Sequence, residues 1–343
     1  MTEPALEAVH VDAADPPLAR FSWRRTILNP RMLWLASAGL IFIALAVLYV
    51  LGMQIPDRWA LGGVYVVGLT SGQSFQIPPF QPLSSFADVQ SPAGISGGGH
   101  FYLLGSDGGG RDTLALIARG AVPSLELVLA AVVTRFIVGV VAGIAMALGS
   151  GSVRALSRSM GRWFAGLPYL AIAILVIQVF SPHSRFLAFV VGMAVVGWRD
   201  IAEVTAQHVE NVLSQPYAEA GRALGTEGLA FFKRHVVPHL RPALAIEIPF
   251  QPSAVLVLLG ELGFLNVYLG NRTYQIVEGR NVLYRLPQTP ELGGLVAGGR
   301  SYILLEQWAA VVVPVLTLFV LALAFELVGR GLRSDSASSS RRG

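Results

Sequence analysis

The sequence predicts an all-α membrane protein with six transmembrane helices and both termini on the cytoplasmic side. Its composition is the first observation behind this prediction: 53% of the 343 residues are hydrophobic and only 13% are charged, whereas soluble domains carry about 25% charged residues. Separate apolar stretches along the chain are the second observation, and the uneven distribution of arginine between them is the third. The chain has no cysteine, which excludes disulfides, thiolate metal sites and cysteine nucleophiles.

Each predicted span is an apolar stretch, and about 20 such residues cross a hydrocarbon core of roughly 30 Å. The six stretches are Leu33–Met53, Leu127–Leu148, Phe164–Phe180, Phe186–Gly197, Ala243–Leu262 and Trp308–Val328. The fourth is short, and we expect Trp198 and the residues after it to continue its helix into the membrane interface. The second contains Arg135, which needs a polar neighbour or a route to the interface because a centred arginine costs roughly 3 kcal/mol.

The orientation of the spans follows from the basic residues. With the N-terminus inside, sixteen of the 25 lysines and arginines fall in cytoplasmic segments and eight outside, and Arg135 is the remainder. An excess of basic residues marks the cytoplasmic side of a membrane protein. The segment Gly149–Arg162, expected to be a short cytoplasmic loop, contributes three arginines and no acidic residue to this count.

This topology divides the chain into five parts. They are a cytoplasmic tail (1–31), the first transmembrane helix (32–53), an extracytoplasmic loop that ends in a GSDGGGRD segment (54–121), a core of five transmembrane helices (122–333) and a disordered tail (334–343). The outer segments 54–104 and 263–306 are rich in glycine and proline, and they are longer than ordinary loops.

The connection between the fourth and fifth spans is mixed and basic: "YAEAGRALGTEGLAFFKRHVVPHLRPAL", Tyr217–Leu244. Pro216 favours a helix start and Gly225 a helix end. Thr226 is placed to cap a second helix, and Pro238 is expected to end it because the residue before a proline avoids the α region. Physical reasoning leaves two interpretations open, an amphipathic helix held to lipid or a docking element for a cytoplasmic protein.

The same stretch resembles the EAA loop of ABC importer permeases, in which a coupling helix sits in a cleft of the ATPase subunit. Glu219, Ala220, Gly225 and Pro238 match the fixed points of that loop, and Gly221 replaces its second alanine. The resemblance implies a cytoplasmic coupling helix within loop 217–238. The residues to which it assigns coupling are Tyr217, Glu219, Ala220, Gly225, Thr226, Leu229 and Pro238.

A second stretch, "LGSDGGGRDTLALIARGAVPSLELVLAAVV", is similar to the segment before the second span of dipeptide/oligopeptide/nickel importer permeases, in their C-type subunit. The residues of its GSDGGGRD part that match are Gly105, Asp107, Gly110, Arg111 and Asp112. The C-terminal "AFELVGRGLR" is also similar to that subunit's ending, so the resemblance covers roughly 104–333. The family's "ExxLSFLGLG" is altered here to "ELGFLNVYLG", beginning at Glu261.

These resemblances imply a type I ABC importer permease fold in a multi-pass protein of the cytoplasmic (inner) membrane. They further imply an assembly with a second homologous permease, two P-loop ATPases and an extracytoplasmic solute-binding protein. ATP and Mg²⁺ would bind to the ATPases. The chain's single lysine, Lys233, follows Phe232, so the Gly-Lys-Ser/Thr of a P-loop is missing here. We expect no catalytic residue, cofactor or metal in this chain, and no nucleic-acid partner. The expected solute is a di- or oligopeptide or a similar small solute, with nickel complexes and glutathione as alternatives.

Several polar residues have more than one interpretation. We expect Asp107, Arg111 and Asp112 to form a salt-bridged turn that opens the second span, rather than to contact solute. Glu247 and Gln251 are candidates for the translocation pathway, because intramembrane carboxylates are functional by default. The alternative for Glu247 is a pair with Arg135 or with another helix.

Two further predictions concern pairs of neighbouring residues. Arg199 and Asp200 are expected to pair at the interface. His235 and His239 straddle Pro238, so we do not expect them to share a helical face or to bind a metal.

Two other classes of function stay open. A proton-coupled secondary transporter would work without an ATPase and would place acidic residues around a central cavity. An intramembrane serine protease built on Ser106 would need a general base near that hydroxyl, and no predicted span offers a convincing histidine.

Overall fold

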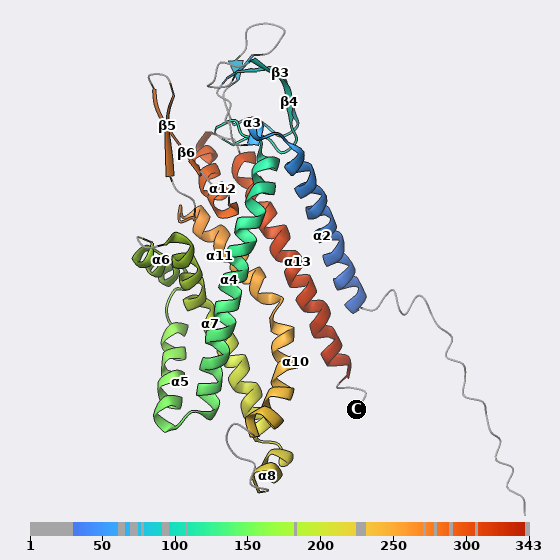
Figure 1. The fold of residues 1–343 in the computed structure, drawn as a ribbon, viewed down its shortest axis with the longest axis vertical. Helices are drawn as coiled ribbons and strands as arrows, with labels where there is room; N and C mark the ends of the chain where they lie inside the picture. Colours follow the sequence, from blue (N-terminus) through green and yellow to red (C-terminus); the bar gives the residue numbers. More distant parts are fainter. Residues whose placement is uncertain are drawn as a thin grey trace, which may run out of the picture.

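A computed structural model shows an elongated, mostly helical molecule (Figure 1). The structure describes residues 30–60, 66–68, 75–76, 79–90, 96–107, 109–181, 184–223, 231–269, 272–277, 280–287, 291–305 and 308–339. The longer helices are α2 (Pro30–Gln54), α4 (Thr113–Leu148), α5 (Gly151–Ala165), α6 (Tyr169–Phe180), α7 (Arg185–Leu213), α10 (Val237–Glu247), α11 (Phe250–Phe264) and α13 (Ala309–Ser339). The shorter ones are α3 (Asp57–Ala60), α8 (Pro216–Ala223), a π-helix (Phe232–Val236), α12 (Leu292–Gly299) and a 3₁₀-helix (Arg300–Leu305).

Within the described ranges, three helices are long and apolar enough to cross a membrane: α2, α4 and α13. The number rises to five if each of two bent pairs counts as one span, α5 with α6 and the π-helix–α10 segment with α11. The fourth predicted span lies in α7, which continues past Trp198 to Leu213, as expected. The helical prediction is therefore confirmed, and the count of six spans stays a prediction.

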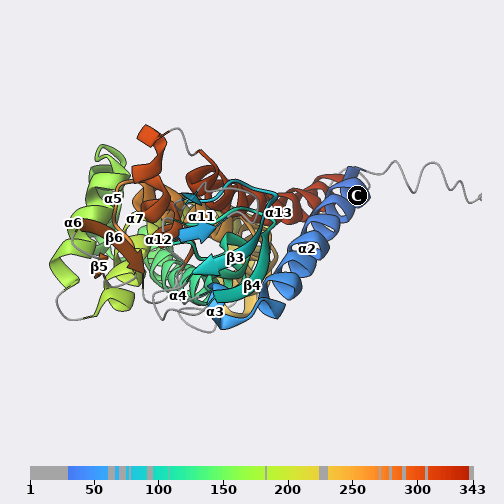
Figure 2. The same ribbon diagram turned by 90° about the horizontal axis from the view of Figure 1, so that it is seen from above.

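The ends of the molecule differ in character. The strands, α3 and α12 gather at one end, and α8 lies at the other (Figure 1). α2 runs toward the strand end and α13 runs away from it, so the start of α2 and the end of α13 both face away from the strands. Seen from above, α2 lies on the opposite side of the bundle from α5 and α6 (Figure 2).

α4 and α7 form the centre of the bundle, and two glycines allow their close approach. A Cβ on Gly139 would lie 2.6 Å from the Cβ of Ile201, and one on Gly143 would lie 2.5 Å from the carbonyl oxygen of Ala202. Small residues at such contacts let helix backbones approach in membrane proteins. The glycines therefore fix how closely these two helices pack.

The third predicted span is interrupted. The segment expected to be a loop, Gly149–Arg162, is mostly α5, and α6 follows at an angle of 103°. Gly166 and Pro168 separate the two helices, and both residue types break helices. In α5, apolar residues recur at helical spacing, with Val153, Leu156, Met160 and Trp163 all exposed, which is the amphipathic pattern that the loop prediction overlooked.

Strands in the two outer segments are an addition to the helical fold that the sequence analysis did not predict. β1 (Val66–Gly68), β2 (Phe75–Gln76), β3 (Ser84–Gln90) and β4 (Ser96–Tyr102) form an antiparallel sheet in the order β2-β1-β3-β4. β5 (Arg272–Val277) and β6 (Arg280–Pro287) form an antiparallel pair. The sequences "RTYQIV" and "NVLYRL" are rich in residues that favour strands, whereas the prediction considered only glycine, proline and length. α4 also begins inside the predicted outer segment, at Thr113.

α12 is fastened to its surroundings through its N-terminus. Glu291 is 1% exposed, and its carboxylate accepts hydrogen bonds from the backbone N–H of Gly293 (2.9 Å) and of Leu269 (3.0 Å). The N–H of Leu292 donates to the Ser124 hydroxyl on α4 at 2.9 Å. These bonds satisfy backbone donors that a helix start leaves open, and they join α12 to α4 and to the chain after α11.

Candidate functional site

The predicted coupling loop begins with α8, at the end of the molecule opposite the strands (Figure 1). Its helix starts at Pro216, as predicted, with Glu219 in the first turn, where a negative charge favours the helix. Ala218 is fully buried, whereas Glu219 and Ala220 are exposed. α8 is therefore anchored by a small buried residue and presents Glu219 outward. Three other predicted coupling residues lie outside the described residues: Gly225, Thr226 and Leu229.

Tyr217 links α8 to the chain that leads into the next long helix. Its ring stacks on His239, with centroids 5.5 Å apart at 17°, and lies 6.4 Å from the His235 ring at 28°. The prediction that these histidines do not share a face is therefore wrong, because both rings meet Tyr217. No group of three potential metal ligands is present among the described histidines and carboxylates.

Pro238 begins a helix instead of ending one. Val237 has helical backbone angles (φ −57°, ψ −43°), and Pro238 stands in the first turn of α10 directly after the π-helix. Proline is tolerated in a first turn because that turn has no use for its missing N–H. This position overrides the tendency of the preceding residue to leave the α region.

The GSDGGGRD segment forms the salt-bridged turn predicted for it. The Asp107 carboxylate accepts from the backbone N–H of Gly109 (3.0 Å) and Arg111 (2.9 Å) and from Arg111 Nε (2.8 Å). Gly105 (φ 79°) and Gly110 (φ 72°) supply the positive φ that the turn requires. Asp112 then caps α4 by accepting from Ala115 N at 3.1 Å.

An aromatic cluster beside this turn was missed by the sequence analysis. His100 Nε2 lies 2.8 Å from the fully buried Asp112 carboxylate, and its ring stacks on Trp59 at 4.6 Å. The hydroxyl of Tyr102 donates to the Gly110 carbonyl at 3.1 Å, and burial raises the pKa of that hydroxyl above its ordinary range. These contacts fix β4 to the start of α4. They could not be predicted from the sequence, because no local sequence pattern indicates them.

A polar cavity of about 480 Å³ lies between α4, α7, α11 and the α5–α6 junction. Arg135, Tyr169, Arg199, Asp200 and Glu261 contribute its polar lining. Arg135 is 3% exposed, and its Nε donates to the Met193 carbonyl at 2.6 Å, which provides the polar neighbour that its position requires.

Two of the charged residues that line this cavity, Glu261 and Arg199, have a side-chain partner. The Tyr169 hydroxyl lies 2.9 and 3.0 Å from the two carboxylate oxygens of Glu261. Arg199 pairs with Glu203 at 2.6 Å and not with Asp200, because residues four apart on a helix face each other and adjacent residues do not. The predicted Arg199–Asp200 pair is therefore wrong.

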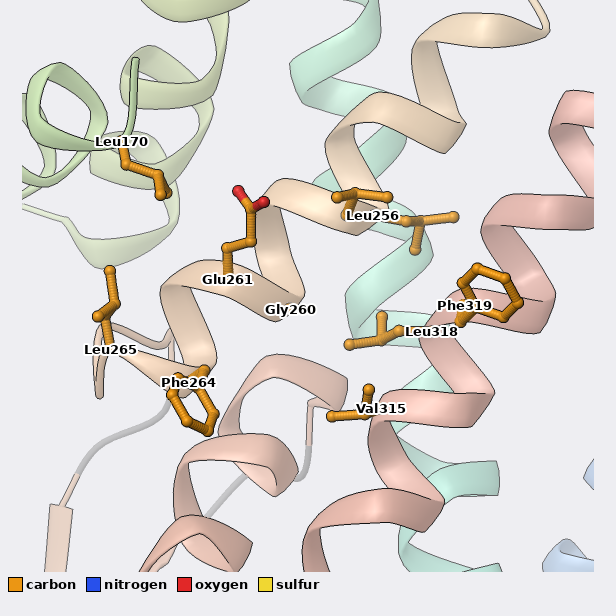
Figure 3. Close-up of a pocket in the computed structure, with 10 residues that line it drawn as sticks. Leu170, Leu256, Gly260, Glu261, Phe264, Leu265, Val315, Leu318 and Phe319 are labelled. Atoms are coloured by element: carbon orange, nitrogen blue, oxygen red, sulfur yellow. The ribbon is translucent and has the colours of Figure 1, made fainter. Parts of the chain in front are cut away.

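An apolar pocket of about 440 Å³ adjoins the polar cavity, and Val257 and Glu261 line both. Its other labelled lining residues are Leu170, Leu256, Gly260, Phe264, Leu265, Val315, Leu318 and Phe319, from α6, α11, the residue after α11, and α13 (Figure 3). Figure 3 shows the Glu261 carboxylate between α6 and α11. We call the two cavities together the Glu261 groove.

The two predicted pathway residues lie elsewhere. Glu247 pairs with Arg333 of α13 at 2.9 Å, which agrees with the alternative that it bonds another helix, although not Arg135. Gln251 is 9% exposed, and neither residue lines the Glu261 groove. Charged residues within the predicted spans do line a cavity, as the prediction assumed, but they are Arg135 and Glu261 and not Glu247.

Comparisons with known proteins relate this chain to transport system permeases. Over residues 139–334 the chain matches the family described as binding-protein-dependent transport system inner membrane component. The di/tripeptide transport system permease protein DppC of Pseudomonas aeruginosa is 28% identical over 282 residues, which cover 81% of this chain and 87% of that protein. The dipeptide transport system permease protein DppC of Haemophilus influenzae is 26% identical over 81% of this chain and 89% of its own length. A solved structure of the MetNI methionine ABC transporter in inward-facing conformations covers 63% of this chain and 96% of its own chain, with 15% identity and a TM-score of 0.44.

Proposed function

The chain belongs to the family of binding-protein-dependent transport system inner membrane components, and on this premise we propose that it forms part of an import path for di- or oligopeptides. It is a permease subunit of an ABC importer. The peptide solute is supported by the names of relatives that align with 81% of the chain.

The proposed assembly follows from the role of a permease subunit. The family works with ATPase and solute-binding partners in general. Here we propose a second homologous permease, two P-loop ATPases and one extracytoplasmic binding protein. ATP and Mg²⁺ belong to the ATPases, and this chain performs no catalysis. We place it in the cytoplasmic membrane with both termini and α8 on the cytoplasmic side. The start of α2, α8 and the end of α13 all lie away from the strands (Figure 1), which supports their placement on one side of the membrane.

The coupling mechanism starts at α8. Its buried Ala218 joins an apolar cluster with Val209 and Val212 of α7, Val236 and Leu240. A force applied to the exposed face of α8 therefore reaches α7 and α10 through packed side chains, since packed interiors transmit displacement and do not absorb it. The same α7 carries Arg199 and Asp200 into the polar cavity, so closure of the ATPases would alter the groove.

The observation that carries this proposal is the attachment of α8, with Ala218 fully buried and Glu219 exposed one residue later. An exposed helix on a buried anchor is suited to docking in a partner's cleft. The ATPase is proposed as that partner because the family works with ATPase subunits in general.

The test is copurification of the tagged chain from detergent-solubilised native membranes, with mass spectrometry of the bound proteins. We expect a P-loop ATPase and a second permease, and ATP-dependent peptide uptake after reconstitution with the binding protein. A chain that purifies alone and moves solute into liposomes without ATP would contradict the proposal and favour a secondary transporter.

A further inference from the structure

The Glu261 groove is lined by charged side chains of both signs, and no salt bridge in the described part of the chain joins one of them to another. Arg135 and Arg199 contribute positive charge, and Asp200 and Glu261 contribute negative charge. Arg199 already pairs with Glu203. Charged groups at membrane depth are costly and mark solute pathways when they face a cavity. The pairing state of Arg135 and Glu261 therefore decides what this groove can bind.

Arg135 offers hydrogen-bond donors that the described residues do not use. A guanidinium carries five N–H donors, and the one hydrogen bond from Arg135 to the described part of the chain uses its Nε. The Nε of Arg199 is also buried without a hydrogen-bond partner among these residues. A guanidinium fork matches a carboxylate bidentately. This side of the cavity is therefore suited to an anionic oxygen pair.

Glu261 presents the opposite chemistry. Its carboxylate meets the Tyr169 hydroxyl, which has a single proton to donate, and no basic side chain pairs with it in the described part of the chain. An ionised carboxylate accepts about four hydrogen bonds. The remaining positions suit a cation that donates several, such as an ammonium group.

The apolar pocket supplies the third feature. It begins at Glu261, where the polar cavity ends, and α11 and α13 line it with Leu256, Phe264, Leu318 and Phe319 (Figure 3). Volumes of about 440 and 480 Å³ lie in the range of roughly 300–1,000 Å³ typical of small-molecule sites. A solute residue with an apolar side chain would place that side chain in this pocket while its ammonium group stayed at the Glu261 carboxylate.

We propose that the Glu261 groove is a solute-binding site within this chain for a zwitterionic peptide with an apolar side chain. Glu261, oriented by Tyr169, receives the α-ammonium group, and Arg135 receives the carboxylate. The side chain nearest the ammonium lies in the apolar pocket. This inference rests on the proposed peptide import function and adds the residues that recognise the peptide inside the membrane.

The first experiment measures equilibrium binding of radiolabelled leucyl-leucine to the purified permease–ATPase complex without its binding protein. The comparison ligands are N-acetyl-leucyl-leucine, which lacks the ammonium, and leucyl-leucinamide, which lacks the carboxylate. In the wild type we expect both capped forms to bind at least about tenfold more weakly than the free dipeptide, because a hydrogen bond to a charged group is worth about one such factor.

Glu261→Gln removes the charge and keeps the shape. We expect it to weaken binding of leucyl-leucine at least about tenfold, to the level of the acetylated form, and to leave binding of that acetylated form unchanged. Arg135→Lys should show the corresponding loss only for ligands with a free carboxylate. Glu326→Gln is the matched control, because Glu326 pairs with Arg330 at a partly exposed position of α13 and does not line the Glu261 groove.

The outcomes separate this site from the proposed function. One outcome would overturn the site and leave the proposed function standing. In it, wild-type proteoliposomes take up leucyl-leucine in an ATP-dependent way, but the ratio of binding between the free and the acetylated dipeptide is the same in Glu261→Gln as in the wild type. A wild-type complex that binds free and capped dipeptides equally, or none of them, would also overturn it. Absence of ATP-dependent uptake of any peptide would defeat the proposed function instead.

Discussion

Arg135 occupies the space that a side chain on Gly197 would need. A Cβ built on Gly197 would lie 2.2 Å from Arg135 Nε and 2.3 Å from its Cζ, although the two residues are on different helices, α4 and α7. The guanidinium therefore holds its place in the cavity only because residue 197 has no side chain.

Gly197→Ala should destabilise the protein by about 1–3 kcal/mol, because overpacking forces a buried side chain to move. Thermal unfolding of the purified complex measures this as a lower Tm. Gly39→Ala is the control, since an added Cβ there meets nothing within 4 Å, and alanine favours the helix by up to about 1 kcal/mol. Equal Tm values for Gly197→Ala and the wild type would contradict the observed contact.

Tyr217→Ala should loosen α8, because it removes the ring that stacks on His239. We expect peptide-stimulated ATP hydrolysis by the reconstituted complex to fall several-fold, since an aromatic pair contributes about 0.5–1.5 kcal/mol beyond its burial. Tyr217→Phe keeps the ring and should behave as the wild type. A loss of the same size in both variants would assign the effect to the hydroxyl and not to stacking.

Replacing Glu219 or Gly225 with tryptophan should uncouple transport while the protein stays in the membrane. A bulky residue in a docking helix costs about 1–3 kcal/mol in a packed cleft, so uptake should fall about tenfold or more. Uptake is measured in cells, and immunoblots of the membrane fraction provide the control for amount. Normal uptake in both variants would rule out α8 and the residues after it as the coupling element.

A peptide tag after Gly343 should react with an impermeant reagent only when the cytoplasmic side is opened. This expectation follows from the excess of arginine in the segments assigned to the inside. A tag inserted between Pro92 and Ala93, in the outer segment, serves as the opposite control. Labelling of the C-terminal tag in intact cells would reverse the proposed orientation.

Glu291→Gln should gain stability relative to the wild type as pH rises. Burial raises the pKa of Glu291, and the backbone N–H groups of Leu269, Gly293 and Gly294 act against that rise. A raised folded-state pKa means that the stability from the protonated carboxyl is complete below the unfolded pKa of about 4.3 and is lost as pH rises through the folded pKa. The amide has no such titration.

The measurement for Glu291 is the Tm of the purified complex between about pH 4 and pH 8. This range begins just below the ordinary glutamate pKa and extends well above it. The Tm of Glu291→Gln minus that of the wild type should increase with pH and then level off. Glu291→Ala serves as a reference that loses the acceptors for two backbone donors, and it should be less stable than the wild type by about 1–3 kcal/mol at the acid end of this range. A difference between Glu291→Gln and the wild type that does not change with pH would contradict the raised pKa.

Much of the helical fold is predictable from the sequence, because a span in lipid must be apolar on nearly every face and this leaves long uniform segments. α2, α4 and α13 follow that rule. The break between α5 and α6 was missed because a hydropathy window averages over Gly166 and Pro168. The strands were missed because β4, "SGGGHFY", owes its pairing to β3 and not to its own propensity.

Among the functional residues, local contacts could also be predicted from the sequence, whereas contacts between distant helices could not. The turn from Asp107 to Asp112 is local, so its hydrogen bonds could be predicted from spacing. The Glu261 groove combines Arg135, Tyr169 and Glu261 from three helices, and contacts at such separation depend on helix rotation, which the sequence of one chain does not reveal. Glu247 was a pathway candidate because intramembrane carboxylates are functional by default, and only the folded arrangement shows Arg333 as its partner.

α7 fixes the distance between the Glu261 groove and α8, the helix proposed to couple to the ATPases. From Gly197, beside the Arg135 guanidinium, to Leu213, just before α8, the helix extends roughly 24 Å at about 1.5 Å per residue. A tilt of ~10° with its fulcrum at Gly197 would sweep the α8 end through ~4 Å while the groove residues next to the pivot hardly translate. A small rotation of α7 at the bound peptide would thus become an ångström-scale displacement of α8 at the ATPase. Conversely, a large displacement of α8 would move the groove residues only slightly.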